Sequence, residues 1–321
     1  MKKHEHNKDL NTFNRRRFLQ GLASGTGLCV ISPEGLKAHK PASADTPSVL
    51  VDITRCIGCR SCMRACKQAN DLPVTTDLTA DFPGTWDSEE LRFDQWTVVN
   101  PVTGHNEDGV EVTRNIKSQC MQCLEPTCVS VCPVGAMTKS EPGPILYSAD
   151  RCIGCRYCIM ACPFDIPKFE WEGGMWAVIG KCQFCAHKRL AEGRLPACVE
   201  SCPTGALKFG TRDALLFEAR ARIKTQPDRY VNHIYGENEA GGTAWLYISD
   251  VPFENIGFKS GVETAPMPPL TWEVLSKIPI MASAMAGLFG TVAWSLNRRE
   301  AAERREAFER REASESQEES E

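Results

Sequence analysis

The grouping of the cysteines restricts the fold of this chain more than any other feature of its sequence. Sixteen of the 17 cysteines form four groups of four, and Cys29 is the one left over. The groups are Cys56, Cys59, Cys62 and Cys66; Cys120, Cys123, Cys128 and Cys132; Cys152, Cys155, Cys158 and Cys162; and Cys182, Cys185, Cys198 and Cys202. Disulfide scaffolds are usually short, secreted chains whose cysteines are spread to link distant loops. The clustered spacing therefore disfavours a disulfide framework.

Two kinds of metal site compete for these thiols. Structural zinc also uses cysteine pairs separated by two residues, but two four-cysteine zinc sites would need only eight cysteines. Bacterial iron–sulfur motifs have the form C-x2-C-x2-C-x3-C-P, and residues 152–163 match it completely. Residues 55–66 (RCIGCRSCMRAC) and 151–162 (RCIGCRYCIMAC) are identical at nine of twelve positions. The pattern favours iron–sulfur ligation, with a zinc-stabilised scaffold that has no redox role as the alternative.

The way the four groups combine follows from two-cluster ferredoxins, in which three cysteines of a motif surround one cluster and the fourth ligates the other. This rule predicts that group two pairs with group three and that group one pairs with group four. The predicted ligand sets are set 1, Cys56, Cys59, Cys62 and Cys202; set 2, Cys66, Cys182, Cys185 and Cys198; set 3, Cys120, Cys123, Cys128 and Cys162; and set 4, Cys132, Cys152, Cys155 and Cys158.

This nested order, with the segment CPFDIPKF at residues 162–169, resembles the four-cluster ferredoxin-like subunits of membrane-bound oxidoreductases. The family includes subunits of formate dehydrogenases, molybdopterin reductases and hydrogenases. The resemblance covers about residues 49–256. It implies four [4Fe–4S] clusters, because Cys128 is present where some relatives lack a cysteine and carry a three-iron cluster.

The stretch between the groups predicts an α+β fold of short elements. Strands at 96–100 and 110–114 would form a hairpin around the turn-rich residues 102–109 (VTGHNEDG). Residues 211–224 have the apolar spacing of an amphipathic helix, and residues 236–248 read as a glycine-rich loop that enters a strand. We expect two pseudo-symmetric bacterial-ferredoxin-like units over residues 45–256.

The first 44 residues have the features of a twin-arginine export signal. Residues 14–20 (NRRRFLQ) precede a mildly apolar run at 21–31, and residues 42–44 (ASA) supply a cleavage site of small residues that ends at Ala44. This route exports folded proteins, so clusters inserted in the cytoplasm would travel with the chain. A basic, disordered N-terminus is the alternative.

The other end predicts a single transmembrane helix over residues 274–297, preceded by a linker (257–273) and followed by a charged cytoplasmic tail (298–321). Residues 278–296 contain no charge over 19 positions, which is long enough to cross the hydrocarbon core of a bilayer. The arginines of the tail place it in the cytoplasm and residues 45–256 in the periplasm. A buried core helix is the alternative. Small residues at Ser283, Gly287 and Thr291 predict a membrane partner against one helix face.

Within the family, the chain is most similar to the ferredoxin-like subunits of hydrogenase-2-type uptake hydrogenases. Residues 118–123 (SQCMQC), 195–200 (LPACVE), 209–212 (FGTR) and 235–243 (YGENEAGGT) carry this similarity. Formate dehydrogenase β-type subunits share the C-terminal helix but commonly depend on a partner's export signal. The resemblance implies electron transfer between a nickel–iron hydrogenase small subunit and a quinone-reactive membrane subunit. The same role beside a formate dehydrogenase or a molybdopterin, sulfur or nitrite reductase is the alternative.

Several functions are disfavoured by composition and motifs. The net charge of −4 and the pI of about 6.0 argue against nucleic-acid binding. The sequence has no HExxH zinc motif and no nucleophile elbow, so we expect no catalytic site of its own. Four basic residues lie within the cysteine loops, where they would raise local reduction potentials or dock partners, with solvated surface charge as the alternative: Arg60, Arg64, Arg156 and Lys181.

Overall fold

The computed structural model describes residues 45–73, 88–140, 143–174, 178–269, 273 and 276–318. The predicted signal peptide at residues 1–44 lies outside the described residues. The chain divides between Pro268 and Pro269 into two compact units. The first holds all four cysteine groups, and the second is helical.

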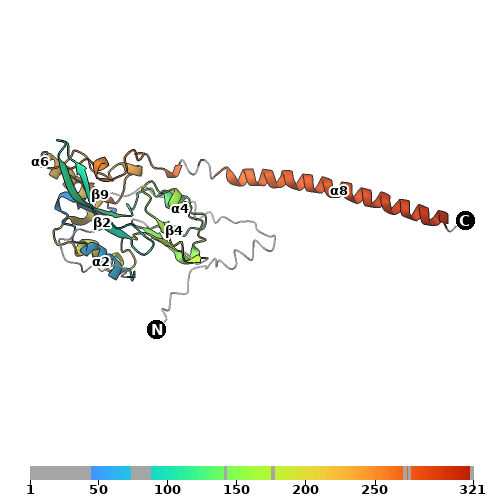
Figure 1. Ribbon diagram of the computed structural model, residues 1–321, viewed down its shortest axis with the longest axis horizontal. Coiled ribbons are helices and arrows are strands. Elements are labelled where there is room, and N and C mark those ends of the chain that lie inside the picture. Colours follow the sequence, from blue (N-terminus) through green and yellow to red (C-terminus); the bar gives the residue numbers. More distant parts are fainter. Residues whose placement is uncertain are drawn as a thin grey trace, which may run out of the picture. The chain divides into compact units, whose positions relative to one another are not determined.

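The cysteine-containing unit is built from short strands and helices, as expected for an α+β domain. Their order is β1 (Pro47–Asp52), η2 (Ile53–Arg55), α2 (Ser61–Ala69), β2 (Thr97–His105), β3 (Glu111–Gln119), α3 (Thr127–Ser130), β4 (Met137–Lys139), β5 (Ile145–Tyr147), η3 (Ala149–Arg151), α4 (Tyr157–Met160), β6 (Lys168–Phe169), β7 (Ile179–Gly180), η5 (Leu190–Glu192), α5 (Ala197–Glu200), β8 (Leu207–Thr211), α6 (Arg212–Thr225), η6 (Glu239–Gly241), β9 (Trp245–Ile248) and η7 (Phe253–Ile256). Figure 1 shows α2 and β9 on one side of this unit and α4 and β4 on the other.

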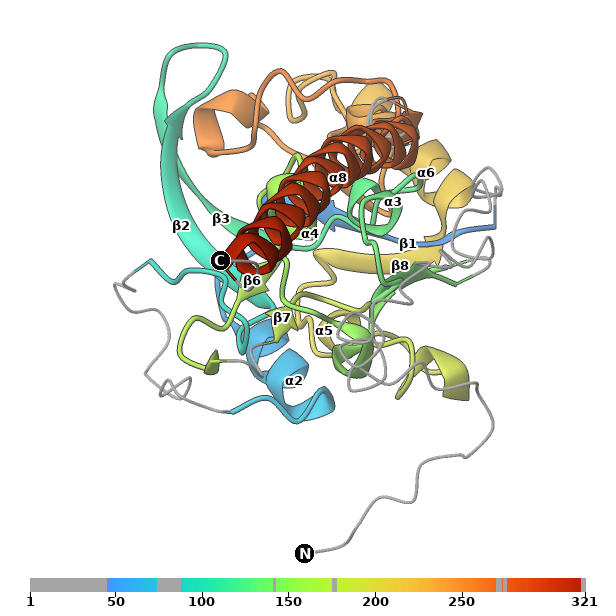
Figure 2. The same cartoon turned by 90° about the vertical axis from the view of Figure 1, so that its right-hand side faces the viewer.

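The same arrangement of strand pair, cysteine loop and helix pair occurs twice. In one copy β1 pairs antiparallel with β8, and in the other β5 pairs antiparallel with β4. A 3-10 turn then leads from β1 into group one and α2, and another leads from β5 into group three and α4. Helix α2 packs against α5, and α3 packs against α4 (Figure 2). The first copy therefore consists of two stretches of chain that are far apart in the sequence, and the second copy lies between them in the sequence.

The core lies on both faces of the three-stranded sheet β8-β1-β9, in which β9 runs parallel to β1. Side chains of a strand alternate between faces, so Val49 and Val51 enter one core cluster and Leu50 enters another. Helix α6 covers the Leu50 face with residues spaced four apart, which are Leu215, Ala219 and Ile223. The predictions of a helix at 211–224 and a strand within 236–248 are confirmed.

The predicted hairpin is also confirmed, but its strands are longer than the sequence suggested. Strands β2 and β3 pair from Thr97 opposite Gln119 to His105 opposite Glu111. Gly104 was expected in the turn, yet it lies in β2, where a Cβ would come within 2.3 Å of the Asn255 carbonyl oxygen. The glycine is needed for this close backbone approach and not for a turn. The longer β3 ends directly before Cys120, so the hairpin positions group two.

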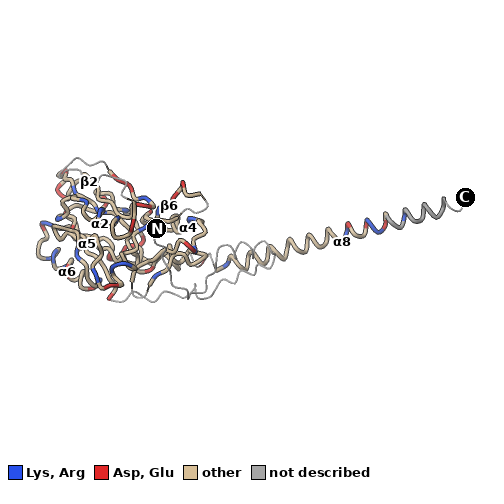
Figure 3. Tube along the Cα trace, turned by 90° about the horizontal axis from the view of Figure 1, so that it is seen from below, with Lys and Arg blue, Asp and Glu red and all other residues tan. Residues whose placement is uncertain are grey.

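The second unit contains the helix α8 (Ile278–Glu318), which includes residues 278–297 of the predicted span and most of the predicted tail. Its segment Ile278–Ala307 is long and apolar enough to cross a membrane, with a mean hydropathy of 1.4, and no part of its apolar window is buried. Figure 3 shows the absence of charge over the first half of the helix, followed by basic and acidic residues. The exposure of this apolar surface argues against the alternative of a buried core helix.

Part of the predicted linker contacts the cysteine-containing unit. Phe258 packs against Tyr235 and Tyr247 with ring centroids 4.7 and 5.0 Å apart. The Ala240 amide donates to the Glu263 carbonyl at 2.7 Å. These contacts extend the ordered chain beyond residue 256, and the exact domain bounds stay a prediction.

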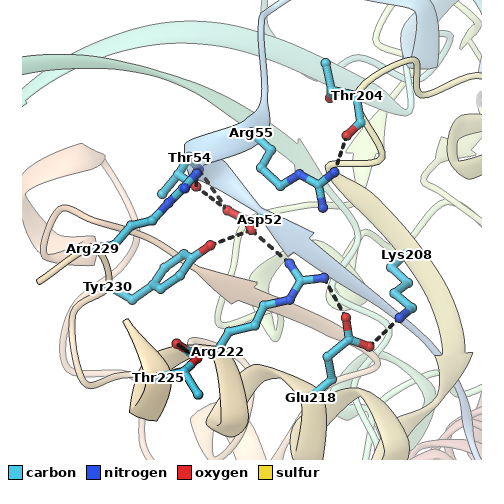
Figure 4. A network of polar contacts seen from close by, with 10 residues as sticks. All are labelled: Asp52, Thr54, Arg55, Thr204, Lys208, Glu218, Arg222, Thr225, Arg229 and Tyr230. Atoms are coloured by element: carbon cyan, nitrogen blue, oxygen red, sulfur yellow. Dashed lines mark hydrogen bonds and ion pairs between the residues drawn. The ribbon is translucent and has the colours of Figure 1, made fainter. Parts of the chain in front are cut away.

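A buried carboxylate fixes the point where β1 leads into the first cysteine loop (Figure 4). Asp52 is 1% exposed and accepts hydrogen bonds from the amide and hydroxyl of Thr54. Its second oxygen accepts from Arg222 and from the Tyr230 hydroxyl, each at 2.9 Å. Asp52 thereby caps η2 and joins it to α6, four residues before Cys56.

Replacing Asp52 with alanine should lower the free energy of unfolding by about 2 kcal/mol, because the Thr54 amide and hydroxyl and the Tyr230 hydroxyl lose their acceptor. The control is Glu218→Ala, which removes the more exposed partner of Arg222 and should change this free energy by no more than about 1 kcal/mol. Urea unfolding followed by circular dichroism measures both changes. Equal effects of the two substitutions would contradict the anchoring role of Asp52.

Candidate functional site

The sixteen grouped cysteines all lie among the described residues, and each has a free thiol. The repeated sequence CIGCR gives the first and third groups the same backbone. Gly58 and Gly154 have φ angles of 73° and 72°, and Arg60 and Arg156 have 54° and 61°. These left-handed conformations turn each loop so that the helix α2 or α4 begins directly after it. The sequence repeat is therefore a repeat of loop geometry.

One cavity collects the cysteines that were predicted as set 2. Cys66 comes from α2, Cys198 comes from α5, and Cys182 and Cys185 come from the loop that follows β7; all four line this cavity. Packing of α2 against α5 makes this possible, since it brings residues far apart in the sequence to the same place. Ligation by these four residues stays a prediction.

The other three sets are also brought together, as their mutual electrostatic effects show. Burial raises the pKa of Cys56, and the nearby thiols of Cys202 and Cys59 raise it further. Burial likewise raises the pKa of Cys123, with contributions from Cys162, Cys120 and Cys128. The pKa of Cys158 is raised to about 12 by burial and then by Cys132, Cys152 and Cys155. Each of these neighbourhoods contains the cysteine predicted to come from the partner group.

Interactions between sets join them in a row. Cys62 of set 1 interacts with Cys198 of set 2, and Cys182 of set 2 interacts with Cys120 of set 3. Cys128 of set 3 interacts with Cys158 of set 4. Neighbouring thiols therefore connect set 1 to set 2, set 2 to set 3 and set 3 to set 4.

The chemistry of the donors fits metal-bound thiolates. Burial raises the pKa of Cys62 and of Cys182 to about 12 and of Cys162 to about 11, so these thiols ionise only if a nearby positive charge compensates them. Metal ions supply such compensation and deprotonate the thiols that bind them. Backbone amides already point at several sulfurs, as for Ala136 to Cys132 at 3.2 Å and Phe184 to Cys182 at 3.3 Å.

The number and type of the donors, sixteen free thiols in four groups, fit iron–sulfur clusters better than single zinc ions. Zinc holds its sulfur ligands at about 2.3 Å and therefore close to one another. Within the described ranges, no three histidine, cysteine, aspartate or glutamate side chains converge on a position for one ion. A cluster core is larger and holds its cysteines further apart. Trp245 is one of the residues that line the cavity of set 2, and its buried indole N–H has no acceptor among the described residues. A cluster sulfur would be such an acceptor.

The basic residues of the cysteine loops occupy different environments. Arg60 is buried and pairs with Glu89 at 2.9 Å, and Lys181 is buried and donates to the Ile145 carbonyl at 2.6 Å. Arg64 is exposed, and Arg156 lies at the surface over the rings of Phe169 and Trp171. The interpretation as solvated surface charge is therefore wrong for Arg60 and Lys181.

Sequence reasoning missed Lys117, which lies in β3 outside every cysteine loop. Burial alone would lower the pKa of Lys117, but the neighbouring thiolates of Cys198, Cys62 and Cys182 reverse this effect and raise it overall. The sequence could have indicated Lys117 only through its place in a buried strand. The predicted strand ended at residue 114, so Lys117 fell outside it, whereas β3 extends to Gln119.

Comparisons with known proteins agree with this site. A 4Fe–4S dicluster domain family matches residues 55–136, and a second 4Fe–4S dicluster domain family matches residues 113–212. A protein of Nitratidesulfovibrio vulgaris is 41% identical over 292 residues, covering 89% of this chain and 78% of its own length.

Two named relatives are also similar. Hydrogenase-2 operon protein HybA of Escherichia coli is 35% identical over 277 residues, covering 76% of this chain and 83% of its own length. A formate dehydrogenase iron–sulfur subunit of Haemophilus influenzae is 34% identical over 249 residues, covering 74% of this chain and 76% of its own length. The chain therefore belongs to the 4Fe–4S dicluster family of iron–sulfur electron-transfer subunits of oxidoreductase complexes, whose members include HybA and the formate dehydrogenase iron–sulfur subunits.

Proposed function

We propose that this protein relays electrons between a nickel–iron hydrogenase small subunit and a quinone-reactive membrane partner, on the periplasmic side of the membrane. The observation that carries the proposal is the row of four cysteine sets. Four [4Fe–4S] clusters bound to them would supply one-electron acceptors at successive positions. The chain contributes their spacing, their burial and the hydrogen bonds to their sulfurs, and the catalytic centre belongs to another subunit.

Exposure of the cysteines supports entry and exit at the ends of the row. Cys155 of set 4 is exposed, and Cys56 and Cys59 of set 1 are partly exposed. Set 2 has three buried cysteines and set 3 has two, whereas sets 1 and 4 have one each. Redox partners would therefore reach sets 1 and 4 more closely than the inner sets.

The preference for a hydrogenase rests on the export signal predicted within the chain itself and on the similarity to HybA. The iron–sulfur subunits of formate dehydrogenases are similar at nearly the same level, so a formate dehydrogenase complex is the second candidate. In either case the protein would be loaded with clusters in the cytoplasm and exported in the folded state.

Helix α8 would anchor the protein with its C-terminus in the cytoplasm, in contact with lipid and with the membrane partner. Hydroxyl groups on the small-residue face are compatible with a lipid environment, because they bond within the helix. Ser283 donates to the Pro279 carbonyl at 2.8 Å, and Thr291 donates to the Leu288 carbonyl at 2.7 Å. The face itself remains free for close approach by another helix.

The purified full-length protein should contain about 16 iron and about 16 sulfide per chain, as four [4Fe–4S] clusters require. Metal and sulfide analysis measures these contents, and electron paramagnetic resonance (EPR) of the reduced protein should show the clusters. Zinc in place of iron, with a silent spectrum, would support the non-redox scaffold instead.

The nested ligand sets predict how paired substitutions combine. Cys66→Ala should lower the iron content to about 12 per chain, and adding Cys182→Ala should remove no more, because both would belong to one cluster. Adding Cys56→Ala to Cys66→Ala should lower the content to about 8, because a second cluster is lost. The opposite result, a further loss with Cys182→Ala and none with Cys56→Ala, would reject the nested scheme.

The catalytic partner can be identified from the intact complex. Membranes of the native host, solubilised in mild detergent, should yield this protein together with a nickel-containing hydrogenase and a membrane subunit. Mass spectrometry and nickel analysis detect the partners. Recovery of a molybdenum enzyme without nickel would reject the hydrogenase in favour of the second candidate.

A further inference from the structure

Lys117 is a buried cation that the electron-relay proposal leaves unused. Its side chain is 3% exposed, and its ammonium donates to the Thr97 hydroxyl at 2.5 Å and to the Gln119 side-chain oxygen at 2.7 Å. Both acceptors are neutral. Within the described part of the chain, no carboxylate forms an ion pair with Lys117. A buried ammonium is strongly disfavoured unless a negative group nearby compensates it.

The cavity of set 2 is the place where such compensation is available. Lys117 and Trp245 line this cavity together with Cys66, Cys182, Cys185 and Cys198, and the ammonium lies 4.7 Å from the centroid of the Trp245 ring. Trp245 is 1% exposed, and its indole N–H lacks an acceptor among the described residues. Two independent features, an uncompensated cation and an unused donor, therefore meet at one cavity.

We propose that Lys117 and Trp245 raise the reduction potential of the cluster held by Cys66, Cys182, Cys185 and Cys198. This inference rests on the ligand sets of the proposed function. Reduction adds negative charge to a cluster, so a fixed cation beside it stabilises the reduced form. An N–H group donated to a cluster sulfur acts in the same direction. Both side chains are almost fully buried, so their effect is weakly screened.

A redox titration of the purified full-length protein, followed by EPR, tests the proposal. The component lost in Cys66→Ala identifies the cluster of set 2. In Lys117→Met, which removes the charge and keeps most of the volume, this component should shift to a more negative midpoint potential. Trp245→Phe, which keeps an aromatic ring and removes the N–H, should shift the same component in the same direction by a smaller amount.

Two further variants separate charge from other effects. Lys208→Met removes an exposed lysine paired with Glu218 and should leave all midpoint potentials unchanged. Lys117→Arg retains the positive charge and should keep the component close to its original potential. Fully loaded Lys117→Met protein with an unchanged potential would overturn the proposal.

Loss of clusters in a variant is also informative. If Lys117→Met assembles without the set 2 cluster while Lys117→Arg retains it, the site requires the charge, which supports the proposal. If both variants lose the cluster, Lys117 serves only to pack β3, which overturns it. Failure of the proposed function looks different, because the unsubstituted protein would then contain no iron–sulfur clusters at all.

Discussion

The structure depends on gathering sixteen thiols, seven of them buried, that must become thiolates when they bind metal. Burial makes ionisation of Cys62, Cys182 and their neighbours unfavourable, so the ligand sets are stable as thiolates only when metal compensates their charge. The short helices and strands agree with this requirement, since most of the chain near the cysteines forms loops that would surround a cluster. Apolar packing is concentrated on the sheet β8-β1-β9 and on α6, and a smaller cluster around β4 and β5 includes Cys128 and Cys158.

Two copies of the same arrangement are closed in different ways. The inner copy uses β4 and β5, which are neighbours in the sequence and pair through a short connection. The outer copy pairs β1 with β8, so it closes only after the whole inner copy has been placed between them. Such non-local pairing is slow to form. A chain of this type gains from assembling its clusters and folding before it leaves the cytoplasm, which agrees with the proposed export route.

The basic residues near the cysteines differ in how deeply they are buried. Arg156 is at the surface, where solvent and aromatic rings surround it, whereas Lys117 and Lys181 are buried among the ligand sets. Cations at the surface act weakly on a cluster because water and salt screen them. The buried lysines are screened less, so their charge would act more strongly on a cluster. They also donate hydrogen bonds within the strands and loops that carry the cysteines.

Much of the site could be predicted because cysteine spacing is a local property. The sequence by itself determined the number of groups, the helix over residues 211–224 and the apolar C-terminal helix, since each follows from spacing or composition within a short window. The nested order of the ligand sets stays a prediction from the rule of two-cluster ferredoxins. The length of the β2–β3 hairpin could not be predicted from the sequence. Gly104 has the character of a turn residue, and only the structure shows that it is needed for close contact with the Asn255 backbone. Only the tertiary structure decided that the sets form a row and that Lys117 and Trp245 meet at the cavity of set 2. These residues lie on different strands, and no local pattern relates the charge of one to the unused donor of the other.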